Sequence, residues 1–308
     1  MSELDLMLNK YRQSLGARMP IKVYFLTWCH FFIYLLVFLT CYGFFLFGDG
    51  IALTLALSIP FGWSWFMLIM IGHDCGHHSF SASERINQLV GFLTLDCIIF
   101  SNKTWQDGHN VVHHRHPKSS EDLMFLRGPS IFQEIRDTAS LALAYNLRDV
   151  RELLRFKLTR PWLVTSIGVL IRLVFLASLS PWALISSFLF AVISANYLGF
   201  LPHSLAEKES SDEWSINQLR KTWDFFPHSK LLASLIFGGL NCHATHHIFP
   251  DLPRSIQSSA ADFLKIQFGC EYRSIDTIGA LFNLLGNRHR LKFVAANQEV
   301  STPSNGNL

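Results

Sequence analysis

Nine of the 14 histidines in this 308-residue chain lie in three short clusters, and their type and spacing predict chemistry. The clusters are His73-Asp-Cys-Gly-His77-His78, His109-Asn-Val-Val-His113-His114 and His243-Ala-Thr-His246-His247. Each cluster contains an i, i+4 pair, and residues four apart share one face of a helix. Neutral imidazole is a common metal ligand, so each cluster is expected to aim two or three nitrogen donors at one point. One such pair could be a packed core pair, whereas three clusters beside apolar segments favour a metal site.

The number and type of these donors restrict the metal. Nitrogen ligands suit iron, copper, zinc and nickel, and eight or nine imidazoles exceed the four ligands of one zinc ion. They are enough for two five- or six-coordinate ions. The clusters contain no paired cysteines and none of the Glu-x-x-His motifs of soluble di-iron bundles. A histidine-rich site with two iron ions is the best fit to this pattern.

The composition of the chain indicates that these clusters belong to a membrane protein. The chain is 50% hydrophobic, 14% aromatic and 16% charged, whereas average chains are about 25% charged. The net charge of +3 is mild, and no Lys/Arg tract suggests nucleic-acid binding. Six scattered cysteines without a CxxC pair predict no disulfide framework. Cys75 and Cys242, beside histidine clusters, are interpreted as small packing residues rather than ligands.

Apolar stretches predict four transmembrane helices, because about 20 apolar residues are needed to cross the hydrocarbon core. The predicted spans are residues 23–48, 51–71, 162–179 and 182–201. Residues 88–100 and 231–240 are apolar but too short to cross. We expect the first to be an interfacial or re-entrant helix that leads to the second cluster, and the other to deliver the third. Arg172, inside the third span, is expected to snorkel, to pair inside the bundle or to meet a polar substrate group.

The distribution of basic residues predicts the orientation. The connections between the first two spans and between the last two contain no Lys or Arg, so the positive-inside rule places both termini, the long polar loop and every cluster in the cytoplasm. The expected fold is an all-α integral membrane protein with four transmembrane helices and a cytoplasmic helical cap that holds the metal site. Residues 1–295 would form a single domain, and residues 296–308 a disordered tail. Residues 1–21 would form either a surface helix or a frayed terminus, with apolar residues near one face at Leu4, Met7, Leu8, Tyr11 and Leu15.

The clusters resemble the three histidine boxes of the membrane fatty acid desaturase and hydroxylase family, which are H-x3/4-H, H-x2/3-HH and H/Q-x2/3-HH after hydrophobic segments. The flanking sequences HDCGHHSF and NCHATHHIFPDLP are also similar, and the resemblance covers roughly residues 25 to 270. It implies four transmembrane helices, a cytosolic cap and two irons held by about nine histidines. The implied ligands, including a further one after the fourth span, are His73, His77, His109, His113, His114, His203, His243, His246 and His247.

Other polar residues near the boxes are candidates for supporting roles. The resemblance implies an asparagine one helical turn before the ligand that follows the fourth span, but that position is Gly199, and the nearest candidates are Asn196 and Asn241. His78 and His116 are expected in supporting or surface roles. Carboxylates that would either orient imidazole N–H groups or be solvated loop acids are Asp74, Asp107, Asp224 and Asp251.

The resemblance implies an oxygen-dependent membrane desaturase that introduces a double bond into a fatty acyl chain. Its cofactors would be two iron ions, and its partners the lipid bilayer, the acyl substrate and a separate ferredoxin or cytochrome-type electron donor. An apolar tunnel would fix which carbon reaches the irons. Alternatives on the same scaffold are a hydroxylase, an acetylenase, a decarboxylase or an oxidase of an isoprenoid substrate. A non-enzymatic membrane metal-binding or transport protein is the alternative from another class, but transporters place ionisable ligands within their spans.

Overall fold

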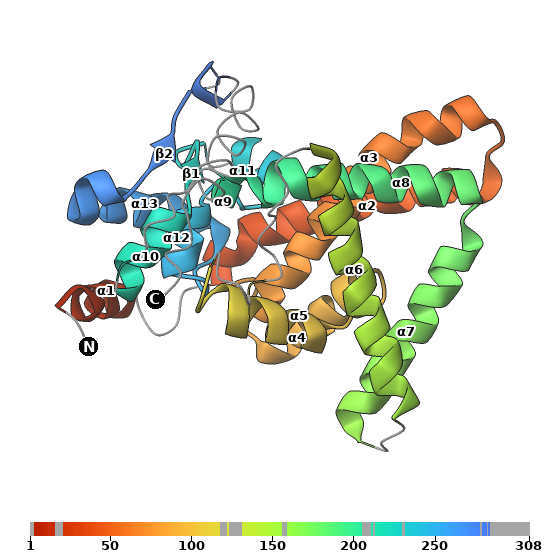
Figure 1. Ribbon diagram of the computed structural model, residues 1–308, viewed down its shortest axis with the longest axis horizontal. Helices are drawn as coiled ribbons and strands as arrows, with labels where there is room; N and C mark the ends of the chain where they lie inside the picture. The colour runs from red at the N-terminus through yellow and green to blue at the C-terminus, as the bar shows by residue number, and fades with distance from the viewer. Residues whose placement is uncertain are drawn as a thin grey trace, which may run out of the picture.

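The computed structural model is mostly helical (Figure 1), as predicted, and it describes residues 3–15, 21–117, 122, 131–155, 159–204, 211, 213–229, 232–277, 279–281 and 283. The long helices are α2 (Phe25–Phe47), α3 (Ile51–Gly76), α6 (Ile131–Leu154), α7 (Arg160–Ser178), α8 (Pro181–Ser194) and α13 (Arg254–Phe268). The shorter α-helices are α1 (Glu3–Ser14), α4 (Glu84–Gly91), α5 (Asn102–Gln106), α9 (Leu201–Ser204), α10 (Trp214–Lys221), α11 (Leu232–Phe237) and α12 (His243–Ile248). Three π-helical turns are η2 (Phe92–Asp96), η3 (Asp107–His113) and η4 (Ala195–Gly199), and two 3₁₀ turns are η1 (Ile21–Tyr24) and η5 (Gly269–Glu271).

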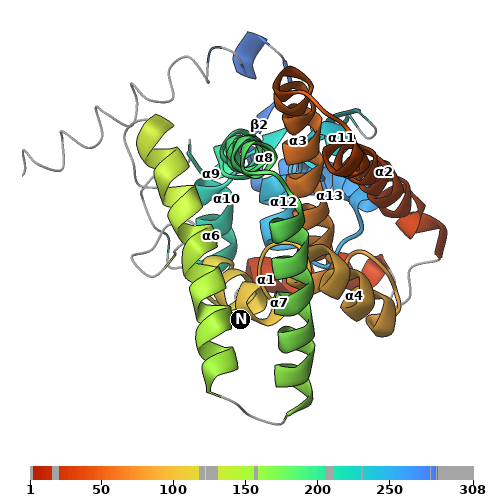
Figure 2. The same ribbon diagram turned by 90° about the vertical axis from the view of Figure 1, so that its right-hand side faces the viewer.

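Three helical segments among the described residues are long and apolar enough to cross a membrane: Lys22–Phe47, Ile51–Gly76 and Pro181–Gly199. They match three of the four predicted spans. The helix expected at 162–179 is present as α7, but its apolar part is shorter, and it runs steeply across the direction of α8 (Figures 1 and 2). The second span is also longer than predicted, because α3 continues to Gly76 and contains His73.

Helix α3 lies between α2 and α8 and forms the centre of the apolar core. Phe61 and Trp65 on α3 are fully buried, and Phe61 stacks on Phe38 of α2 with ring centroids 4.6 Å apart. At Gly62 the backbones of α3 and α8 approach so closely that an added Cβ would lie 2.5 Å from the carbonyl oxygen of Ser187. A glycine is therefore required at this crossing.

A buried ion pair fixes α7 against α6. Arg172 of α7 donates from Nη2 to Asp149 of α6 at 3.1 Å and from Nη1 to the carbonyl oxygen of Ile99. The side chains of Arg172 and Asp149 are only 3% and 1% exposed. Asp149 also accepts the backbone N–H and the hydroxyl of Ser101, just before α5. Of the three roles considered for Arg172, pairing inside the protein is therefore the one observed. The ion pair neutralises a charge that would otherwise be buried alone.

A second apolar cluster joins α1, α10, α12 and α13 into a cap at one end of the helices (Figure 1). The apolar face predicted near the N-terminus packs here, since Leu8 is buried and Tyr11 stacks on Phe263 at 3.8 Å. Of the two interpretations of this segment, the helix is therefore the one observed. The cap also contains two parallel strands of two residues each, β1 (Asp224–Phe225) and β2 (Ser274–Ile275). The all-α prediction is wrong in this detail, because two residues are too few for a detectable alternation.

The short apolar segments form short helices and turns, and their place relative to the membrane stays a prediction. Residues 88–100 form the end of α4 and the turn η2, and the stretch 231–240 contains α11. After α11, Gly238 and Gly239 adopt φ values of 63° and 84°, a region that favours glycine, and they turn the chain into α12. The tail predicted at 296–308 lies outside the described residues, and the single domain over 1–295 stays a prediction.

Candidate metal centre

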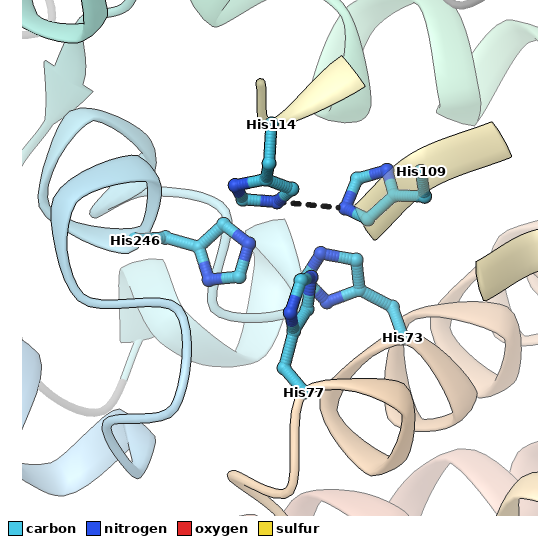
Figure 3. Close-up of side chains that lie close together, drawn as sticks. All are labelled: His73, His77, His109, His114 and His246. Atoms are coloured by element: carbon cyan, nitrogen blue, oxygen red, sulfur yellow. Dashed lines mark hydrogen bonds between the residues drawn. The ribbon is translucent and has the colours of Figure 1, made fainter. Parts of the chain in front are cut away.

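The structure brings the nine predicted site histidines together, and every one of them is buried, with side chains between 0% and 7% exposed. They come from α3 and its C-terminal end, η3 and its end, α9 and α12. They form two groups, in each of which one nitrogen per side chain lies within 4.8 Å of all the others. The first group, drawn in Figure 3, is His73, His77, His109, His114 and His246, and the second is His113, His203, His243 and His247.

The i, i+4 pairs His73/His77 and His243/His247 each contribute to one group, as expected, whereas the pair His109/His113 is divided between the two. The second cluster divides, because η3 is π-helical and the N–H of His114 bonds to the carbonyl oxygen of His109, five residues back, at 3.0 Å. In such a turn residues i and i+5 share a face, so His109 and His114 enter the first group while His113 enters the second. The third cluster divides as well, with His246 in the first group.

The two groups lie side by side. The rings of His114 and His247 are stacked with centroids 4.4 Å apart, and those of His109 and His113 are 5.0 Å apart. Adjacent residues of one box thus supply donors to both groups. This arrangement suits two neighbouring metal ions rather than two independent sites.

Several imidazoles are oriented by hydrogen bonds at Nδ1, on the side away from the centre of the group. The pairs are His73 with Asp74 (3.2 Å), His113 with Asp122 (2.9 Å), His203 with the carbonyl oxygen of Lys221 (3.1 Å) and His247 with Oε1 of Gln218 (2.8 Å). An acceptor at Nδ1 fixes the ring orientation and the tautomer, and it makes the opposite nitrogen a better ligand.

The nitrogens on the other side of these rings have the environment that a metal ion requires. The Nε2 atoms of His73, His77, His246 and His247 are buried without a hydrogen-bond partner among the described residues. Leaving a polar atom buried and unpaired costs about 1–3 kcal/mol, a cost that a bound metal ion would remove. The donor set therefore fits metal binding.

The charge state of the rings is also suitable. Burial is the largest cause that lowers the pKa of His77, His109 and His114 well below its usual value, and neighbouring imidazoles lower it further. The same two causes act on His243, His246 and His247. These rings are neutral near pH 7, so their lone pairs are free for coordination.

Only one of the four candidate carboxylates contacts a site imidazole. Asp74 bonds to His73 and also accepts from Nε of Arg254 at 2.7 Å. Asp107 pairs with Lys103 and Arg148, and Asp251 pairs with Arg12, so of the two roles considered, these two carboxylates have the one away from the imidazoles. Asp224 instead accepts the first N–H groups of α12. Asp122 and Gln218 were not predicted, because isolated polar residues in a loop or on a short helix have no distinguishing spacing.

The remaining candidates lie outside the two groups. Asn196 is buried, and its amide donates to the hydroxyl of Thr138 and to a backbone carbonyl, whereas the amide of Asn241 is directed at Phe226 and Cys242. His78 and His116 are exposed, and His78 pairs with Glu84. Their expected surface roles agree with these positions.

An apolar cavity of about 100 Å³ opens on the histidines between α3, α6 and α8. Its apolar walls include Phe66, Met70, Phe100, Leu141, Phe188 and Val192. The site side of the cavity is formed by His73, His109, His113, His203 and His243. The arrangement can therefore place an apolar chain beside the histidines.

Comparison with known proteins agrees with the family resemblance of the histidine boxes. The sequence pattern of the fatty acid desaturase family matches residues 49–271. Similar curated proteins include the chloroplastic omega-6 fatty acid desaturases of Arabidopsis thaliana (24% identical over 71% of this chain and 56% of the relative) and Brassica napus (25% identical over 63% and 51%). A third is the sn-1 oleoyl-lipid 12-desaturase of Picosynechococcus sp. (42% identical over 17% and 15%). The chain spans about half the length of the omega-6 relatives.

The family match covers all three histidine boxes and the helices that carry them. The apolar helices, the buried histidines and this match agree, and the chain belongs to the fatty acid desaturase family of membrane oxidoreductases.

Proposed function

We propose that this protein is an oxygen-dependent desaturase that introduces a double bond into a fatty acyl chain and uses two iron ions. The observation that carries the proposal is the pair of buried histidine groups at the wall of an apolar cavity. The names of the relatives, which are omega-6, omega-3 and 12-desaturases, support a fatty acyl substrate.

The nine histidines are proposed as the iron ligands, five for one ion and four for the other. Bound iron would supply the redox chemistry with O₂ that no side chain provides, since removal of hydrogen from an unactivated methylene is beyond acid–base catalysis. The neutral imidazoles hold the metals without adding charge. Asp74, Asp122 and Gln218 hold the rings in position through Nδ1.

The cavity is proposed as the seat of the acyl chain. Its phenylalanine and leucine walls would contact the methylenes of the chain. A chain held in one position along these walls would have one particular carbon beside the histidines. That selection gives the double bond its position.

Four membrane crossings are proposed, with α7 as a tilted crossing beside the three longer ones. The support is connectivity, because the α7–α8 turn and the α2–α3 turn lie at the same end of the molecule, away from the cap (Figure 1). The cap and the histidines would then face the cytoplasm, as the basic residues predict. There, a separate ferredoxin or cytochrome-type donor would supply electrons.

The test is mass spectrometry of the fatty acids in a heterologous host that has a suitable electron donor. The intact chain would be compared with a His113→Ala, His246→Ala variant, which removes one histidine from each group. The matched control is a His78→Ala, His116→Ala variant, which removes two exposed histidines. We expect a product lighter by two hydrogen atoms with the intact chain and the control only. A product heavier by one oxygen atom would change the assignment to a hydroxylase, and a product that persists in the first variant would contradict the proposed site.

A further inference from the structure

One buried guanidinium, that of Arg254 in α13, connects the cap to the first histidine group. The side chain of Arg254 is only 1% exposed, and it forms an ion pair with Asp74, whose side chain is 8% exposed. Burying two charges costs several kcal/mol of desolvation, and such pairs often add little net stability. A role in placing neighbouring groups therefore accounts for this pair better than a contribution to stability does.

The three nitrogens of the guanidinium are directed at three different partners. Nε donates to Oδ2 of Asp74 at 2.7 Å, Nη1 to Nδ1 of His30 at 3.2 Å, and Nη2 to the carbonyl oxygen of Met70 at 3.5 Å. Two of these partners belong to α3, and His30 belongs to α2. Two helices thus fix the orientation of the guanidinium, and the point charge of a lysine could not reproduce this geometry.

His30 serves as an acceptor in this arrangement. Arginine has only N–H donors, so the Nδ1 atom of His30 that faces Arg254 carries no proton, and the hydrogen of this ring lies on Nε2. His30 is fully buried, and it belongs to neither of the two histidine groups. Its described polar contact is with the arginine, which it helps to hold in place.

Asp74 transmits this orientation to the first histidine group. While Oδ2 accepts from Arg254, Oδ1 accepts from Nδ1 of His73 at 3.2 Å. The Nε2 atom of the same ring is buried without a hydrogen-bond partner among the described residues, and His73 is a member of the first group (Figure 3). A carboxylate held at both oxygens has little freedom to rotate, so it fixes the ring of His73.

We propose that Arg254 is a positioning residue for the first histidine group, because it holds Asp74, which in turn orients His73. The inference rests on the proposed iron site and assigns the affinity for one of the two ions to this chain of contacts. The second group has acceptors of its own, Asp122 and Gln218. Loss of Arg254 should therefore weaken the binding of one ion much more than that of the other.

The experiment follows the release of iron from the purified full-length protein against increasing concentrations of a chelator. The variants are Arg254→Gln, Asp74→Asn and the double variant that combines them. Two further variants, His77→Ala and His243→Ala, each remove one histidine from one group and identify which step of the release belongs to which group.

The matched control is Arg12→Gln. Arg12 also forms an ion pair in the cap, but its described partner is Asp251 rather than a carboxylate that holds an imidazole. Its iron release should equal that of the intact chain in both steps.

We expect Arg254→Gln and Asp74→Asn each to lower the iron affinity of the first group by roughly tenfold. The double variant should lose no more than the weaker-binding single variant, since the two residues act through one contact. It also leaves no unpaired charge in the interior, so it remains measurable if a single variant folds poorly. Arg254→Lys should recover only part of the affinity, because it keeps the charge without the three directed N–H groups.

Two results would overturn the inference. An equal loss of both ions in Arg254→Gln would show that the arginine acts only by docking the cap, since α12 supplies histidines to both groups. Additive losses in the double variant would show that Arg254 does not act through Asp74. Failure of the proposed desaturase function looks different, because the intact protein would then bind iron without forming product, and the release assay would still decide the role of Arg254.

Discussion

At the scale of single residues, metal affinity is expected to depend on the side chains that hydrogen-bond to the imidazoles as well as on the imidazoles themselves. Asp122 is buried and accepts the Nδ1–H of His113 at 2.9 Å. A carboxylate at this position raises the basicity of the ring and fixes its orientation toward the second group. An amide accepts the same hydrogen bond more weakly.

Asp122→Asn is therefore predicted to weaken iron binding by roughly tenfold or more. The measurement is the iron retained by purified protein against increasing concentrations of a chelator. Asp107→Asn is the matched control, because Asp107 pairs with Lys103 and Arg148 on the surface and contacts no site imidazole. Equal iron loss in the two variants would contradict the role assigned to Asp122.

The identity of the nine histidines was accessible from the sequence, but their division between the two groups was not. Spacing predicts shared faces only if the backbone is α-helical. The π-helical turn η3 changes the period, so His113 and His114 face different groups although they are neighbours. A π turn depends on tertiary contacts and leaves no pattern in the sequence. The polar partners Asp122 and Gln218 escaped prediction because only the folded chain brings them to a ring.

At the scale of elements, Asp224 holds the helix that carries the third box. Its carboxylate accepts the N–H groups of Ala244 (2.6 Å) and Thr245 (3.2 Å), at the N-terminus of α12, and the hydroxyl of Tyr272 (2.7 Å). Burial is the largest cause that raises the pKa of Asp224 from 3.8 to about 6. Because the folded pKa lies above the unfolded value, Asp224 contributes stability below its unfolded pKa that is lost as the pH rises through about 6.

Asp224→Asn is accordingly predicted to destabilise the protein, with a cost that becomes smaller between about pH 5 and about pH 7. Thermal unfolding of both forms in detergent at the two pH values measures this difference. Asp262→Asn, at an exposed position of α13, should show no such change. A cost that grows with pH would show that the carboxylate is stabilised in its charged form.

The crossing of α3 and α8 depends on Gly62. An added Cβ would lie 2.6 Å from Cβ of Phe190 and closer still to a backbone carbonyl of α8, so the helices must move apart. Gly62→Ala is predicted to cost about 1–3 kcal/mol of stability. Gly43→Ala, in α2, meets no atom within 4 Å and should be neutral or should gain up to about 1 kcal/mol from helix propensity. Thermal unfolding measures the stability of both variants, and an equal change in the two would contradict the close approach of α3 and α8.

Hydropathy predicted α2, α3 and α8 well, because long apolar runs are a direct signal. It missed the continuation of α3 through His73, since the polar residues there are buried by the cap and by the second box. It also missed the steep direction of α7, because apolarity carries no information about helix orientation. That direction is set by contacts such as the Arg172–Asp149 pair.

At the scale of the whole molecule, the histidine site lies where the long helices meet the cap. Arg254 of α13 joins the two parts, since it donates to Asp74 at 2.7 Å, beside His73 on α3. Gly239, with φ of 84°, makes room for it, because a Cβ there would lie 2.8 Å from Nε of Arg254. Residues from distant parts of the chain thus reach the site only when the cap is docked, so metal binding and cap docking should stabilise each other.

The proposed orientation predicts which cysteine can be labelled from which side. Cys270 is the exposed cysteine among those described, and it lies in the cap. A membrane-impermeant maleimide should label it only after cells are opened. An Asp49→Cys, Cys270→Ser variant places the thiol in the exposed α2–α3 turn and should be labelled in intact cells. The reverse pattern would contradict a cytoplasmic site.

The measurement that tests the central claim most directly is the metal stoichiometry of the intact protein, purified in detergent after expression with iron. The two histidine groups predict two iron ions per chain, and His246→Ala and His247→Ala, adjacent changes in different groups, should each lower that content. One iron ion per chain, or zinc in its place, would contradict the two-ion site. No metal at all would contradict the account of the histidines as ligands.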